Sequence, residues 1–152
     1  MDLHVGQVLP SAFELEATFS MTDLMFDELR APTGARLREW GLKVKSLDGD
    51  AVEQIIALGS THMRPSRPDL SGLYLAKRMN ATLLTGDAAL RAAAETEDVE
   101  VHGTLWLMDR LVLQSVLSPR EAGRALQLMD EDPDRWLPRQ ELRARVRRWM
   151  RE

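Results

Sequence analysis

The segment Ala81–Glu95, ATLLTGDAALRAAAE, constrains the fold more than any other part of the sequence. It opens with a short, continuously apolar run, which is typical of a strand covered on both faces. Gly86 and Asp87 follow, and an alanine-rich stretch with high helix propensity comes directly after them. A strand that passes through a short turn into a helix is the repeating unit of parallel α/β folds. The segment therefore predicts one such unit, with an ionised carboxylate at its turn.

The same alternation of strand and helix continues through most of the chain. Connections between parallel strands are right-handed crossovers, so the alternation predicts an α/β fold with a mainly parallel central sheet and helices on both faces. Periodicity and propensity predict strands at 18–21, 42–47, 82–85 and 99–102, and helices at 11–17, 23–30, 50–58, 70–79, 88–96 and 104–116.

Composition and charge limit the classes of function. The 152 residues are 44% hydrophobic and 29% charged, as expected for a globular domain. The chain has no cysteine, which excludes disulfides and thiolate metal sites. It has neither an apolar run of roughly 20 residues nor an N-terminal secretory pattern, so we expect a cytoplasmic protein with no membrane segment. The net charge of −4 implies that any nucleic-acid site uses a local basic patch or bound metal ions.

The residues beyond Val116 have a different character, which predicts a division into residues 1–116 and a C-terminal helical extension at 117–152. A polar, turn-rich stretch is followed by an amphipathic pattern at 139–152. Its apolar stripe contains Leu142, Val146, Trp149 and Met150, and its other faces are rich in arginine. We expect this helix to pack on the rest of the protein through Leu142, Val146 and Trp149.

Three acids are the main candidates for chemistry. Asp87 follows a predicted strand, and open parallel sheets bind ligands beyond the carboxyl ends of their strands. Asp69 stands at a predicted helix start, and Glu28 lies about one helical turn after the first strand. The alternative is structural: Asp69 and Asp87 occupy positions typical of N-caps, and Glu28 is typical of a solvated helix residue. His4, His62 and His102 lack the spacing of metal ligands.

Two segments resemble the PIN domain family. Residues 68–111, PDLSGLYLAKRMNATLLTGDAALRAAAETEDVEVHGTLWLMDRL, resemble the C-terminal half of a PIN domain, and residues 19–29, FSMTDLMFDEL, resemble the part that carries its helical acid. The resemblance extends from about residue 3 to residue 116. It implies the three-layer fold of that family, with a mainly parallel central sheet between helices.

The resemblance also implies a nuclease-type site. In that family a few acids bind Mg²⁺ or Mn²⁺, and the bound ion activates water that cleaves a phosphodiester. Three of these acids match Glu28, Asp69 and Asp87. Close carboxylates repel one another, and a hard divalent cation relieves that repulsion. The implied function is a metal-dependent ribonuclease, such as the toxin of a toxin–antitoxin pair. The alternative, from another class, is a catalytically inactive PIN-like module that binds a partner protein.

One departure from the family affects these expectations. PIN domains open with an apolar strand that ends in an acid, and the sequence MDLHVGQVLP resembles the stretch that follows that strand. Asp2 does not match the acid. We therefore expect either that the start is set too late or that the first strand is absent, with weak or no cleavage by these residues alone. Unpaired inner strand edges would favour association, for example as a homodimer.

Five arginines are candidates for contact with RNA phosphates or with the acidic surface of an antitoxin: Arg64, Arg67, Arg143, Arg147 and Arg151. Positive charge gathers in the C-terminal segment although the whole chain is negative, and a local basic patch is typical of a protein that binds an anionic ligand. The alternative is a solvated helix face that pairs with the excess acids of the chain.

Overall fold

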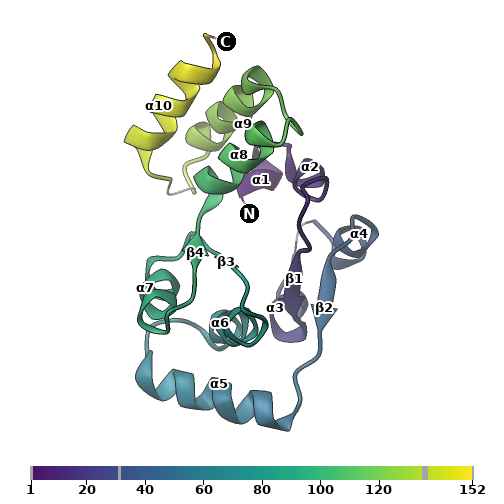
Figure 1. Ribbon diagram of the computed structural model, residues 1–152, viewed down its shortest axis with the longest axis vertical. Helices are drawn as coiled ribbons and strands as arrows, with labels where there is room; N and C mark the ends of the chain where they lie inside the picture. Colours follow the sequence, from purple (N-terminus) through teal and green to yellow (C-terminus); the bar gives the residue numbers. More distant parts are fainter. Residues whose placement is uncertain (1, 31, 135–136, 152) are drawn as a thin grey trace. The chain divides into compact units, whose positions relative to one another are not determined.

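The chain divides into two compact units in the computed structural model (Figure 1). The α/β unit is Thr18–His102, and the helical unit combines Met1–Ala17 with Gly103–Glu152. The boundary at residue 116 stays a prediction. The structure describes residues 2–30, 32–134 and 137–151.

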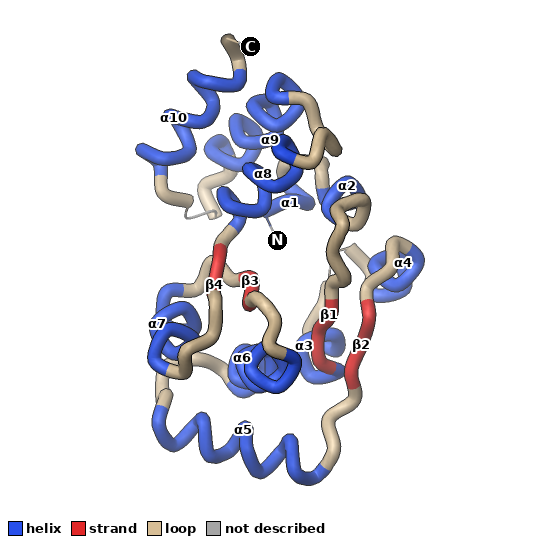
Figure 2. The backbone as a smooth tube through the Cα atoms, viewed as in Figure 1, coloured by secondary structure: helices blue, strands red, loops and turns tan. Residues whose placement is uncertain are grey.

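The four described strands all pair in parallel, which confirms the α/β fold class (Figure 2). β1 (Ser20–Thr22) pairs with β2 (Lys43–Lys45), and β3 (Leu83–Leu84) pairs with β4 (Val101–His102). They form two two-stranded sheets, whereas the sequence predicted one central sheet. The strands have only two or three residues each, and no described strand pairs with both β1 and β3.

Helices connect the strands of the α/β unit. The predicted helices are present with ends that differ by a few residues, and the prediction at 88–96 matches in full. The sequence analysis missed α4, a short helix in which only Leu37 is buried, so its apolar pattern is too brief to detect. The helices of this unit are α3 (Asp23–Asp27), α4 (Gly34–Glu39), α5 (Gly49–Thr61), α6 (Arg67–Met79) and α7 (Ala88–Thr96).

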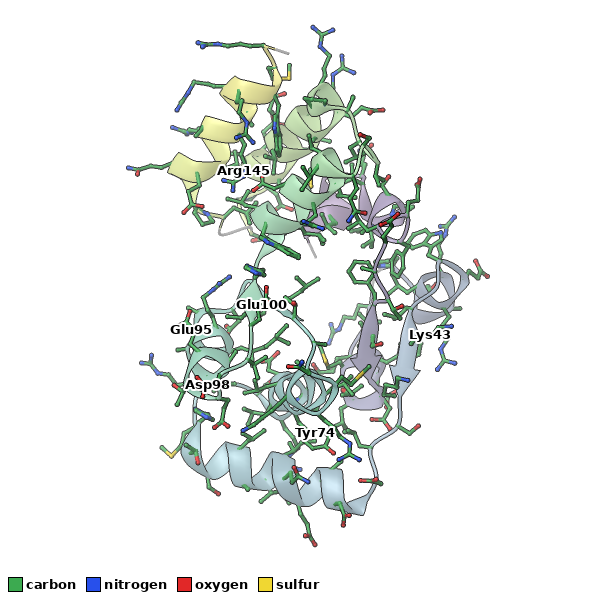
Figure 3. All side chains as sticks on the ribbon, viewed as in Figure 1. Lys43, Tyr74, Glu95, Asp98, Glu100 and Arg145 are labelled. Carbon is green, nitrogen blue, oxygen red and sulfur yellow. The ribbon has the colours of Figure 1, made fainter. Side chains whose placement is uncertain are left out.

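Helix α6 is the centre of the α/β unit because it contacts β1, β3, α3, α5 and α7. Its Leu73 is fully buried in the main apolar cluster, and its Tyr74 lies on the side that faces α5 (Figure 3). Ser71 Oγ lies 2.6 Å from Thr22 Oγ1 of β1, and both residues are completely buried. At Gly72 a Cβ would lie 2.9 Å from Met25 Sδ, so the close approach of α3 favours glycine there. α6 thus contacts one strand of each sheet.

A polar cluster joins the ends of three helices in the same unit. The side chain of Glu97, just after α7, is 18% exposed and has two partners. His62 Nε2, just after α5, lies 2.8 Å from Glu97 Oε1, and Lys77 Nζ of α6 donates to Glu97 Oε2 at 2.6 Å. These hydrogen bonds, from Lys77 first and then from His62, hold the pKa of Glu97 below its ordinary value of 4.5.

We expect Glu97→Gln to destabilise the protein at pH 7 and to lose this effect in acid. A carboxylate whose folded pKa lies below its unfolded pKa stabilises the protein above the unfolded value. That contribution falls as the pH drops below about 4.5, where the wild-type carboxyl group also becomes neutral. Urea unfolding of both proteins between pH 7 and pH 3 measures the difference. Glu95→Gln, at an exposed position on α7, is the control, and an equal difference at every pH would contradict the assignment.

The described residues of the helical unit form two short N-terminal helices and three longer C-terminal ones. The predicted helix at 11–17 is wrong in position, because the structure has a turn of helix at Leu9–Ala12 with proline in its first turn, where a missing N–H costs nothing. The helices are α1 (Asp2–Val5), α2 (Leu9–Ala12), α8 (Thr104–Leu113), α9 (Pro119–Glu131) and α10 (Arg139–Trp149). In the part of the chain that the structure describes, no helix is long and apolar enough to cross a membrane.

Helix α10 packs along α9, and its apolar stripe is the one predicted from the sequence. Leu142 and Trp149 are 1% and 2% exposed, whereas Val146 is only half-buried. Met150 is 37% exposed, and its sulfur lies near Gly123 of α9, where a Cβ would come within 3.1 Å of it. Close packing at Gly123 therefore holds the end of α10 against α9.

Candidate functional site

Asp87 lies at the junction between β3 and α7 and caps the helix, as the sequence predicted. Its Oδ1 accepts a hydrogen bond from Leu90 N at 2.8 Å. Its own N–H donates to Thr85 Oγ1 at 3.1 Å, which fixes the turn between the strand and the cap. The residue is exposed, and its Oδ2 has no hydrogen bond among the described residues. One carboxylate oxygen beyond the carboxyl end of β3 is therefore available for a ligand.

Asp69 is the third residue of α6, not its N-cap. Ser66 is the cap, and the sequence Ser66-Arg67-Pro68-Asp69 forms a capping box. Asp69 Oδ2 accepts from Ser66 Oγ at 2.6 Å and from Ser66 N at 3.2 Å. The sequence analysis placed the N-cap at Asp69, three residues too late. It did not use the spacing of three residues between Ser66 and Asp69 that marks a capping box. Asp69 Oδ2 is thus used in the cap, and within the described chain Oδ1 accepts no hydrogen bond.

Glu28 ends the short helix α3 as its C-cap and is exposed. The helix begins at the carboxyl end of β1, where Thr22 Oγ1 accepts from Met25 N at 3.2 Å. The acid directly after β1 is Asp23, which the sequence analysis did not single out. Its two oxygens accept from Leu24 N and Leu47 N, so Asp23 ties the ends of β1 and β2 together and is occupied by structure.

The three predicted acids come from three separate elements: the end of α3, the first turn of α6 and the start of α7. In residues 2–30, 32–134 and 137–151, no group of three or more histidine, aspartate or glutamate side chains is close enough to hold a metal ion. The oxygen donors are of the type that Mg²⁺ and Mn²⁺ prefer. The donor chemistry fits such an ion, while the described side chains do not form an assembled three-acid group.

The predicted arginine contacts lie in both units. Arg64 is in the loop before α6, Arg67 is the first residue of α6, and both are exposed. The other three, Arg143, Arg147 and Arg151, lie on α10 or in the turn after it and are exposed as well.

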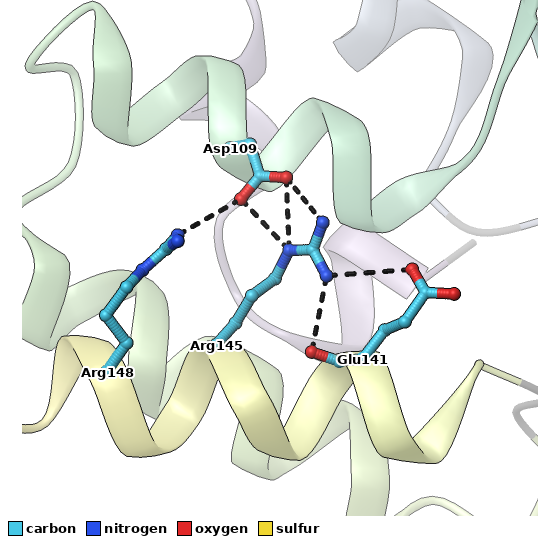
Figure 4. Close-up of polar contacts among 4 residues, drawn as sticks. All are labelled: Asp109, Glu141, Arg145 and Arg148. Atoms are coloured by element: carbon cyan, nitrogen blue, oxygen red, sulfur yellow. Dashed lines mark hydrogen bonds and ion pairs between the residues drawn. The ribbon is translucent and has the colours of Figure 1, made fainter.

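One arginine of α10 has a structural role, shown in Figure 4. Arg145 donates from Nε and Nη2 to the carboxylate of Asp109 on α8, at 2.9 Å and 2.6 Å. Two further side chains flank this pair. Glu141 Oε2 lies 3.7 Å from Arg145 Nη1, and Arg148 Nη2 lies 3.6 Å from Asp109 Oδ1. The hydrogen bonds to Asp109 raise the pKa of Arg145 above its ordinary value. A bidentate pair of this kind fixes α10 against α8 with a defined orientation.

Comparison with known protein families shows that residues 2–151 match a family described as a PIN domain. No curated protein and no solved structure matches the chain. The family match covers nearly every residue, including α9 and α10, and it agrees with the parallel strands and connecting helices of the α/β unit. The chain belongs to the PIN domain family.

Proposed function

We propose that this chain is a metal-dependent ribonuclease of the PIN type. The observation that carries the proposal is the family match over residues 2–151, because PIN domains have a nuclease-type fold. Since a fold hosts more than one function, the site must support the assignment as well. The best local support is Asp87, which stands at the carboxyl end of a parallel strand with one oxygen used in a cap and the other available.

In this proposal Glu28, Asp69 and Asp87 hold a Mg²⁺ or Mn²⁺ ion. When bound, such an ion lowers the pKa of its water and stabilises the charge that develops on a phosphate. The residues of this chain position carboxylate oxygens for it. The capping bonds of Asp69 and Asp87 restrict both side chains, which lowers the conformational cost of binding an ion. Carboxylates that approach one another without an ion repel, so the three acids need not be assembled before the ion binds.

The biological setting that we propose is a toxin that acts on RNA and is bound by an antitoxin protein. Self-association is part of the same proposal, since β1 and β3 each have one edge without a described partner strand and such edges recruit further strands. Arg64 and Arg67 lie on the loop and helix start that carry Asp69, so they are proposed contacts for the substrate phosphates near that acid.

An inactive, partner-binding module is the second candidate. One observation favours it: the described residues contain no assembled group of three acids. Exposed strand edges would then serve as a docking site for a partner protein.

A cleavage assay tests the first candidate against the second. A labelled single-stranded RNA is incubated with the chain in Mn²⁺, in Mg²⁺ or in EDTA. We expect cleavage that requires the metal ion and that Asp69→Asn lowers on the order of 100-fold, since even groups that only orient metal ligands contribute 10- to 100-fold. Cleavage that persists in EDTA would contradict the metal-dependent mechanism. Absence of cleavage in every condition would favour the binding module.

A further inference from the structure

Four arginines form a regular stripe on the C-terminal helix. Arg139, Arg143 and Arg147 lie on α10, and Arg151 lies in the turn that follows it. Residues four apart on an α-helix lie about 40° apart around its axis and roughly 6 Å apart along it. The four side chains therefore project from about one third of the helix circumference. We call this set the arginine stripe.

The packing of α10 leaves the stripe exposed. Leu142 and Trp149 face α9, and Arg145 binds Asp109 of α8, so the apolar side and one flank of the helix are covered. The arginine stripe lies on the opposite flank from Arg145. The side chains of Arg139 and Arg143 are 73% and 62% exposed, against 21% for Arg145.

The stripe has few internal counter-charges. Asp130 of α9 lies near two of the arginines: its Oδ1 is 3.9 Å from Arg139 Nε, and its Oδ2 is 3.8 Å from Arg143 Nε. Both distances exceed ordinary hydrogen-bond length. Among the described residues no ion pair involves Arg147 or Arg151. The only acid on α10 is Glu141, and it lies beside Arg145 on the other flank. Exposed ion pairs contribute little free energy, so the contacts to Asp130 leave Arg139 and Arg143 available to bind another anion.

The charge of α10 contrasts with that of the whole chain. The helix has five arginines and one glutamate, whereas the full sequence has a net charge of −4. An acidic protein repels a polyanion unless positive charge is concentrated locally. We propose that the arginine stripe binds the phosphate backbone of single-stranded RNA. This inference rests on the proposed ribonuclease function and names the surface that captures its substrate.

RNA fits the stripe better than an acidic protein does. A nucleic-acid strand carries one phosphate per nucleotide at regular intervals, and a row of evenly spaced guanidinium groups matches such a row of anions. Arginine binds phosphate oxygens through two parallel N–H donors, which favours it over lysine at such contacts. Within the described chain, the one large apolar side chain beside the stripe is Met150, which is 37% exposed and packs with its sulfur against Gly123 of α9, whereas a protein docking site normally has an apolar centre. The stripe therefore predicts binding with little sequence preference and a strong salt dependence.

Direct binding in EDTA tests this inference without reference to cleavage. The probe is a fluorescent single-stranded RNA, titrated with wild-type chain at several salt concentrations. The test variant is Arg143→Gln/Arg147→Gln/Arg151→Gln. The matched control is Lys43→Gln/Lys45→Gln/Arg78→Gln, which removes three exposed charges from the α/β unit. Glutamine removes the charge but keeps a polar, unbranched side chain with a similar helix propensity, and circular dichroism confirms that each variant is folded.

We expect the test variant to bind RNA on the order of tenfold or more weakly at low salt. Its slope of log affinity against log salt should be about 2 smaller, because each phosphate contact to a single strand contributes roughly 0.7. The control variant should bind like wild type. Equal loss in both variants, unchanged binding in the test variant, or no binding by wild type at low salt would each overturn the inference. Polyglutamate, titrated under the same conditions, represents an acidic protein partner. If the test variant lost polyglutamate binding but retained RNA binding, the inference would be overturned in favour of such a partner. Because EDTA prevents metal-dependent cleavage, these results hold whether or not the chain is a nuclease.

Discussion

Trp149→Ala should lower the free energy of unfolding by about 3–5 kcal/mol, the range found for removal of a buried large aromatic side chain. Trp149 is 2% exposed and is one of the largest fully buried side chains of the described protein. It closes the interface between α10 and α9 beside Gly123 and Met150. Alanine would remove the aromatic contacts and leave a cavity that the rigid helix pair cannot fill, so most of the lost packing energy should be measurable.

Urea unfolding followed by circular dichroism measures this loss. Leu113→Ala is the matched control, because Leu113 lies in the same unit and is 71% exposed. We expect a change within about 0.5 kcal/mol for the control, as for most surface substitutions. A loss below about 1 kcal/mol for Trp149→Ala would contradict the packing of α10 on α9 through this residue.

Local sequence signals predicted the elements that depend on local forces. The helix at 88–96 and the Asp87 cap were both predictable, because the apolar run, the turn and the alanine-rich stretch act within a few residues of one another. The apolar stripe of α10 was predictable for the same reason. The sequence analysis predicted a helical extension at 117–152 but did not place helix α9 within it. The start of α9 nevertheless has a clear signal, in which Ser118 precedes a proline and Glu121 completes a capping box.

Features that depend on distant residues were not predictable. The pairing of β1 with β2 and of β3 with β4, in two sheets, depends on contacts between segments far apart in the sequence. The pair between Asp109 and Arg145 joins residues 36 positions apart, so the arginine-rich pattern alone did not separate the structural arginine from the exposed ones. The arrangement of Glu28, Asp69 and Asp87 has the same dependence on tertiary structure. Their identity as metal ligands comes from the family resemblance and stays a prediction.

Asp87→Asn separates the two roles of this residue. Asparagine caps a helix about as well as aspartate, so the bond to Leu90 N and the stability of α7 should be retained. The substitution removes the negative charge and one hard oxygen ligand, so metal binding should weaken. Asp48→Asn is the matched control, because Asp48 caps α5 in the same way through Ala51 N at 2.8 Å and is not a proposed ligand.

Titration of the chain with Mn²⁺ in a calorimeter tests the central claim most directly, since it detects the ion without RNA and without turnover. We predict one Mn²⁺ site per chain, which Asp87→Asn weakens on the order of 10- to 100-fold and Asp48→Asn leaves unchanged, with equal unfolding midpoints for both variants. Equal Mn²⁺ affinity in wild type and Asp87→Asn, or no Mn²⁺ binding by the wild-type chain, would contradict the assignment of Asp87 as a metal ligand.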